Sequence, residues 1–171
     1  SAITHADYVI YLDDTLLAPG WESELKPGGM VLVNSAKSVD ELLRGIDAEG
    51  GSPARFDSAS AGVPSSPLAD KAEKIFALDA NGISSALLGR PIPNTVFLGA
   101  LSLLCDQVPF DAVNEAVRQY MPAKLHEKNL AIVAEARHAM AQALVDRAVA
   151  RQAREACAEG AGDESAAAGR L

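Results

Sequence analysis

The polar side chains best placed for chemistry are Asn94 and Thr95, which stand at the start of an apolar run. In GRPIPNTVFLGALSLL (residues 89–104) they follow two prolines and precede a nearly unbroken hydrophobic stretch. Their amide and hydroxyl groups could bind a ligand beside a helix N-terminus, a position that favours anions. The same residue types cap helices, because their oxygens accept the free N–H groups of the first turn. Capping is the commoner role of this pattern, and both interpretations stay open.

Three aspartates end apolar stretches that are typical of buried strands. Asp13 and Asp14 close ADYVIYLDD, and Asp79 stands near the end of KIFALDA. Ligands of α/β proteins bind at the carboxyl ends of strands, and two carboxylates could hold magnesium. Neighbours on a strand point to opposite faces, so Asp13 and Asp14 do not converge by themselves. We therefore expect both regions to serve as helix caps, the first at Thr15 and the second after Asp79.

Histidine and cysteine form no recognisable catalytic or metal-binding set. His126 could shuttle a proton near neutral pH, but the lysines and glutamate around it indicate a solvated helix face. Cys105 and Cys157 are far apart, and zinc sites or iron–sulfur clusters usually need four ligands. Cys105 lies in an apolar run and is expected to be an inert buried thiol. We predict no catalytic residue and no metal ligand in this chain.

Composition excludes several classes of partner. The chain has 171 residues, which suits one domain, and a formal net charge of −8. Such a charge argues against nucleic acid, whose phosphates need Lys and Arg, and against anionic membrane surfaces. No apolar run reaches the ~18–20 residues of a membrane span, and no signal peptide is recognisable. With no disulfide framework implied, we expect a cytoplasmic protein.

The order of apolar runs predicts an α/β fold with a mostly parallel, Rossmann-like sheet flanked by helices. Strands are expected at 6–14, 30–33 and 74–80, the second preceded by a Pro-Gly-Gly turn. Helices are expected at 38–50, 81–89, 95–104, 108–121 and from 125 to about 158.

Local signals mark the ends and contacts of these helices. Ser38 and Glu41 have the spacing of a capping box. Asn81 is a possible cap of the helix that Gly89 ends. Pro91 and Pro93 should hold the backbone extended before Asn94. In the apolar helix that follows, the small residues at 99 and 100 should let another backbone approach closely.

Two segments differ from the rest in composition. Residues 51–70 are rich in Gly, Ser, Pro and Ala, which predicts a long surface loop or an arm that orders against a partner. Residues 139–171 are rich in Ala, Arg and Glu, which predicts a helical extension ending in a disordered tail. The main domain is therefore expected to cover residues 1–138, with a loop insertion at about 51–70.

Four blocks, taken in order, resemble the gamma subunit of the 2-oxoacid:acceptor oxidoreductases. They are DYVIYLDDTLL, LKPGGMVLVNS, IFALDANGISSALLGRPIPNTVFLGALSLL and VPFDAVNEAVRQYMPAKLHEKNLAIVAEA, and the resemblance covers residues 6–48 and 73–138. Enzymes of this family act on pyruvate, 2-oxoisovalerate, 2-oxoglutarate or phenylglyoxylate. GRPIPNT and KLHEKN look closer to the pyruvate and aryl-glyoxylate types than to the indolepyruvate enzyme, whose smaller subunit has a similar domain.

The resemblance implies a complex that oxidatively decarboxylates a 2-oxoacid with coenzyme A and passes electrons to ferredoxin or NAD. Thiamine diphosphate and Mg²⁺ are implied for the alpha and beta subunits, and [4Fe–4S] clusters mainly for the beta and delta portions. The gamma chain is then mainly structural and binds no cofactor alone. It can help to line the coenzyme A cleft, for which Asn94 and Thr95 are the candidate residues.

The sequence departs from the family pattern at its N-terminus. Gamma subunits usually begin with a strand and a GxGGQG turn, which are absent here, so the resemblance implies a missing N-terminal portion and exposed sheet edges. We expect the helix from Thr95 and the C-terminal helix to contact partner subunits. Three alternatives are a stand-alone nucleotide- or acyl-binding module, the smaller subunit of an indolepyruvate oxidoreductase, and a structural bridging protein that uses its C-terminal segment.

Overall fold

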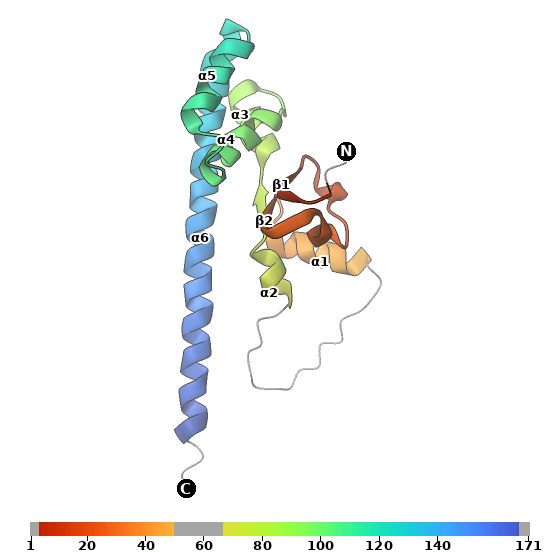
Figure 1. Cartoon of the computed structure of the whole chain (residues 1–171), viewed down its shortest axis with the longest axis vertical. Helices are drawn as coiled ribbons and strands as arrows, with labels where there is room; N and C mark the ends of the chain where they lie inside the picture. The colour runs from red at the N-terminus through yellow and green to blue at the C-terminus, as the bar shows by residue number, and fades with distance from the viewer. Residues whose placement is uncertain (1–3, 50–66, 168–171) are drawn as a thin grey trace.

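The computed structural model describes residues 4–49 and 67–167 and shows an α/β arrangement around a long C-terminal helix (Figure 1). The strands are β1 (Ala6–Tyr11), β2 (Leu25–Asn34) and β3 (Ile75–Leu78). The helices are α1 (Val39–Glu49), α2 (Pro67–Ala72), α3 (Ala80–Leu88), α4 (Asn94–Leu104), α5 (Phe110–Tyr120) and α6 (His126–Ala167). Short 3-10 turns η1 (Asp14–Leu16) and η2 (Trp21–Glu24) connect β1 to β2, and η3 (Ala123–Leu125) precedes α6.

The three strands form a parallel sheet in the order β1-β2-β3, which confirms the predicted fold class. Side chains on β2 alternate between two hydrophobic clusters. Leu32 belongs to the cluster made with α3, α4 and α6, whereas Val31 and Val33 belong to the cluster made with α1. All three are fully buried. Both faces of the sheet are therefore covered, as the continuous apolar strands predicted.

The Pro-Gly-Gly sequence lies inside β2, and the prediction of a turn before the strand is wrong. β2 begins at Leu25, and its register against β1 shifts where Ala6 and Tyr8 of β1 pair with Leu25 and Met30. This irregularity absorbs the extra residues of β2 as a bulge. Within it, Gly28 has a left-handed φ of 79°, a conformation that glycine adopts without the steric cost of a Cβ.

Helix caps depend on local spacing, and most were predicted correctly. Glu41 accepts the backbone N–H of Ser38 at 2.8 Å, while the Ser38 hydroxyl accepts that of Glu41 at 3.3 Å. Asp79 caps α3 by accepting the N–H of Gly82 at 2.7 Å. Asn81 lies inside α3, so its suggested role as the cap is wrong. Gly89 ends α3 with a left-handed φ of 77°, as expected.

Helices α4, α5 and α6 pack together beside the sheet, and α6 extends well past the other elements (Figure 1). Gly99 of α4 lies directly against the α6 backbone, which confirms the predicted close approach. α6 runs without a break across the expected boundary at residue 138 and reaches Ala167, where the sequence predicted a disordered tail. No described helix is long and apolar enough to cross a membrane.

The predicted loop lies mostly outside the described residues. Of its expected range, 51–70, the structure describes only residues 67–70, and these belong to helix α2 rather than to a loop. Pro67 at the first position explains the start of α2, since its fixed φ suits a helix and its missing N–H is not needed there.

Candidate functional site

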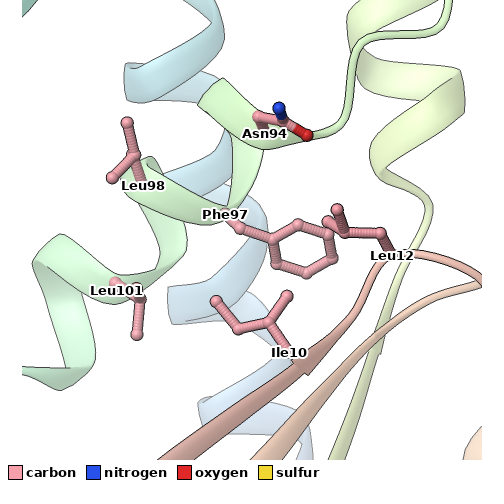
Figure 2. Close-up of a pocket in the computed structure, with 6 residues that line it drawn as sticks. All are labelled: Ile10, Leu12, Asn94, Phe97, Leu98 and Leu101. Atoms are coloured by element: carbon pink, nitrogen blue, oxygen red, sulfur yellow. The ribbon is translucent and has the colours of Figure 1, made fainter.

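A small apolar pocket lies where the carboxyl end of β1 meets the N-terminus of α4. It has a volume of about 260 Å³, and the residues that line it are Ile10, Leu12, Asn94, Phe97, Leu98 and Leu101. Figure 2 shows the side chains of Ile10, Leu12 and Phe97 pointing toward one another, with Asn94 at the start of α4. Five hydrocarbon side chains and one amide make this a site for an apolar group with a single hydrogen-bonding partner.

The position of Asn94 depends on a buried serine in α3. The Ser84 hydroxyl donates to the Ala80 carbonyl at 2.7 Å and accepts the backbone N–H of Ile92 at 2.9 Å. This second bond attaches the proline-containing connection (residues 89–93) to α3. Because that connection ends at Pro93, the attachment fixes where α4 begins and where Asn94 lies.

The predicted capping by Asn94 or Thr95 is wrong. Both residues lie within the first turn of α4, and no side chain caps this helix. The preceding residue, Pro93, has φ −72° and ψ −19°, so it is helical and not extended as predicted. The cap position therefore falls on a proline, which has no side-chain oxygen, and Asn94 and Thr95 stand one and two residues too late to cap.

The structure also separates the two candidate residues. Asn94 is exposed and lines the pocket, whereas Thr95 is 4% exposed and does not line it. No side chain caps α4, but Thr95 and Val96 in its first turn are buried, so the exposed Asn94 is the first-turn residue that a ligand in the pocket can meet. Of the two residues expected to line a ligand cleft, only Asn94 is placed at a pocket.

Asp13 and Asp14 diverge, but not by strand alternation as predicted, because β1 ends at Tyr11 and Asp14 begins the turn η1. Asp13 accepts the backbone N–H of Thr15 at 3.0 Å and its hydroxyl at 2.7 Å, which confirms its capping role and lowers its pKa. Asp14 turns toward β2, where it accepts the Ser35 hydroxyl at 2.7 Å and pairs with Lys37 at 3.1 Å. The hydrogen bond from Ser35 and the charge of Lys37 hold the pKa of Asp14 below its ordinary value.

Sequence reasoning missed Asn34, which joins three elements at the carboxyl edge of the sheet. This residue is 6% exposed and ends β2. Its amide N–H₂ donates to the Leu12 carbonyl at 2.9 Å, and its carbonyl accepts the N–H of Asn81 at 3.2 Å. It therefore holds the pocket residue Leu12 against β2 and α3. The sequence feature that could have identified Asn34 is its position directly after the four apolar residues of the strand predicted at 30–33.

The other candidate residues take structural positions. His126 is half-buried, and its Nε2 lies 2.7 Å from the Met121 carbonyl, so the predicted solvated face is wrong for its ring. Cys105 is half-buried just after α4, rather than fully buried within it. Among residues 4–49 and 67–167, no group of three His, Cys, Asp or Glu side chains could hold a metal ion.

A second apolar hollow of about 430 Å³ lies between Leu98 of α4 and helix α5. Leu98 lines both this hollow and the first pocket. Two large side chains at this face are open to solvent, since Leu98 is 42% and Tyr120 78% exposed. The face formed by α4 and α5 is therefore apolar, hollowed and uncovered in the described part of the chain.

Comparison with known proteins places this architecture in a family. Residues 1–139 match the family model described as pyruvate ferredoxin/flavodoxin oxidoreductase. The pyruvate/ketoisovalerate oxidoreductases common subunit gamma of Thermococcus kodakarensis is 32% identical over 135 residues, which are 78% of this chain and 61% of that protein. The pyruvate synthase subunit PorC of Methanothermobacter marburgensis is 31% identical over 128 residues, which are 74% of this chain and 56% of that protein.

A solved structure shows the same fold. It is the crystal structure of the pyruvate oxidoreductase subunit PORC of Thermotoga maritima, with a TM-score of 0.55 and 23% sequence identity. The alignment covers 80% of this chain and 64% of that one. The chain thus spans about three fifths of the length of the curated relatives it matches, 61% in the case of the Thermococcus protein.

Proposed function

The chain belongs to the pyruvate ferredoxin/flavodoxin oxidoreductase family, and from this membership we propose that it acts as the gamma subunit of a multisubunit 2-oxoacid oxidoreductase. The complex would oxidatively decarboxylate a 2-oxoacid of the pyruvate or phenylglyoxylate type with coenzyme A and pass the electrons to ferredoxin or NAD. The observation that carries the proposal is the family match over residues 1–139, together with relatives named as oxidoreductase subunits.

The role proposed for this chain is to shape the complex rather than to react. The described residues contain no group of three metal-ligating side chains. By the family resemblance, thiamine diphosphate, Mg²⁺ and the [4Fe–4S] clusters would be held by the alpha, beta and delta subunits, and these cofactors supply the carbanion and electron chemistry. The apolar face of α4 and α5, with Leu98 and Tyr120 exposed, is the proposed contact for one of these subunits.

The pocket that Asn94 lines suits the pantetheine arm of coenzyme A and not its phosphates. Its volume of about 260 Å³ is below the ~300–1,000 Å³ of sites that enclose a whole small molecule. None of its lining residues is Lys or Arg, the residues that bind phosphates. We therefore assign the pocket to the uncharged pantetheine arm, with the Asn94 amide as its hydrogen-bonding partner, and leave the phosphates to another chain.

Purification of the tagged full chain from its own host tests the proposal. We expect it to bring down a chain that binds thiamine diphosphate and a chain that carries iron–sulfur clusters, and the assembly should form acyl-CoA from a 2-oxoacid. A panel of pyruvate, 2-oxoisovalerate and phenylglyoxylate then identifies the substrate. A chain that purifies alone and binds a nucleotide or acyl ligand as a monomer would instead be a stand-alone binding module, and the subunit proposal would be abandoned.

A further inference from the structure

The outer edge of β3 is occupied by a side chain from α6. The carbonyl of Lys74, just before β3, accepts the N–H of Val31 in β2 at 2.7 Å. The carbonyl of Leu78, at the end of β3, accepts the N–H of Ser35, the residue that follows β2, at 3.1 Å. Residues of a parallel strand face its two edges alternately. The N–H and C=O groups of Ile75 and Ala77 therefore face away from β2. No strand in the described part of the chain pairs with them.

The guanidinium of Arg147 takes up the outward carbonyl of Ile75, and also the carbonyl of Glu73 in the turn just before β3. Its Nη1 donates to the Glu73 carbonyl at 2.6 Å, and its Nη2 donates to the Ile75 carbonyl. The guanidinium carbon lies 3.4 Å from the centre of the Phe76 ring, so the group is also stacked on an aromatic face. Arg154, two turns further along α6, pairs with the Glu73 carboxylate at 3.0 Å.

These contacts come from the part of α6 that the family model does not match. The match ends at residue 139, whereas Arg147 and Arg154 lie beyond it. Arg147 is half-buried, and this burial lowers its pKa. The C-terminal extension thus contacts the start of β3 through these two arginines, in addition to the packing of Met140 against the hydrophobic core.

We infer that Arg147 closes the outer edge of β3 against pairing with the same edge of a second copy of this chain. An uncovered edge strand offers its N–H and C=O groups to other chains, and identical edges can pair about a two-fold axis. Arg147 occupies the position that an N–H group of an incoming strand needs at the Ile75 carbonyl, and its bond to the Glu73 carbonyl holds it at the start of this edge. The rest of the edge, at Ala77, opens on a groove of about 810 Å³ whose walls carry Asp40, Asp146 and Arg154.

The test is the mass of the full chain in sedimentation velocity over a wide range of concentrations. Arg147→Met keeps an apolar stem over Phe76 but removes every donor. We expect its weight-average mass to rise with concentration toward twice that of the unchanged chain at the same concentration. The matched control is Arg151→Met on the same helix, because Arg151 is 61% exposed and pairs with Glu155, four residues on. The control should behave like the unchanged chain.

A second substitution identifies the edge responsible. The N–H of Ala77 faces outward, so Ala77→Pro removes no bond to β2 but blocks pairing at this edge. In the Arg147→Met background it should restore the original mass profile. A mass that does not rise overturns the inference, and so does a rise that Ala77→Pro leaves in place. If Arg147→Met loses its circular dichroism, Arg147→Leu replaces it under the same criteria, since it also removes every donor.

Discussion

Gly99 of α4 lies so close to Val133 of α6 that a Cβ atom at position 99 would come within 2.5 Å of the Val133 carbonyl oxygen. The same Cβ would lie 2.8 Å from the Cβ of Ala136. Both distances are shorter than a van der Waals contact, and the obstacles are backbone and a Cβ, which cannot rotate away. The helix pair that carries the pocket residues Phe97 and Leu98 therefore depends on a residue without a side chain.

Gly99→Ala should push α4 away from α6 and destabilise the fold by about 1–3 kcal/mol or more, as overpacking does in other cores. Urea unfolding of the full chain measures this change. Gly45→Ala is the matched control, because a Cβ at Gly45 of α1 meets nothing within 4 Å. That substitution should stabilise the helix by about 0.5–1 kcal/mol. Equal effects at the two positions would contradict the close packing of α4 on α6.

Ser84→Ala should loosen the connection that places Asn94. The substitution removes the acceptor for the Ile92 N–H, a loss of about 1 kcal/mol for one hydrogen bond. Hydrogen exchange should speed up at the Ile92 amide and at the start of α4, while β2 keeps its protection. Ser85→Ala, at a neighbouring half-buried serine, is the control and should leave exchange at Ile92 as it is. Unchanged exchange in Ser84→Ala would show that the connection is held by other contacts.

Asn94→Ala and Thr95→Val should differ in the assembled complex, since only Asn94 lines the pocket. If Asn94 binds the pantetheine arm, Asn94→Ala loses one hydrogen bond and the KM for coenzyme A rises by about tenfold or less. The KM for the 2-oxoacid should stay constant. Thr95→Val keeps the buried shape and should leave both constants unchanged. An equal rise in KM for both variants would show that the effect comes from α4 as a whole and not from the pocket.

The Asp14 carboxylate should make stability depend on pH in the acid range. Its pKa is depressed in the folded chain by the Ser35 hydroxyl and by Lys37, whereas in the unfolded chain it is about 3.9. Ionised Asp14 therefore stabilises the fold above that value, and the contribution is lost as the pH falls through the folded pKa. Urea midpoints of Asp14→Asn should lie below those of the unchanged chain at neutral pH and converge with them in acid.

Asp47→Asn, at an exposed carboxylate on α1, controls for the change in net charge in this experiment. Its urea midpoints should follow those of the unchanged chain at every pH. A constant difference between Asp14→Asn and the unchanged chain down to the lowest pH would rule out a linked proton at Asp14.

Features that depend on residues near in sequence were predictable. The capping box of Ser38 and Glu41 spans three residues, and the Asp79 cap also reaches only three residues ahead. The parallel sheet follows from continuous apolar strands, which only a sheet covered on both faces can bury. The bulge at Gly28 was not predictable, because Pro-Gly-Gly suits a turn equally well until β1 pairs beside it.

The sequence by itself determined the parallel sheet, the caps at Ser38 and Asp79 and the family resemblance, because these rest on periodicity and on contacts within one turn. Only the tertiary structure decided that Asn94 lines a pocket while Thr95 is buried, since the helical angles of Pro93 set where α4 begins. Only the tertiary structure brings Arg147 to the edge of β3, where it donates to the carbonyl of Ile75, a residue 72 positions earlier in the sequence. Such contacts depend on how helices pack on a sheet, and no local pattern of residue types specifies that packing.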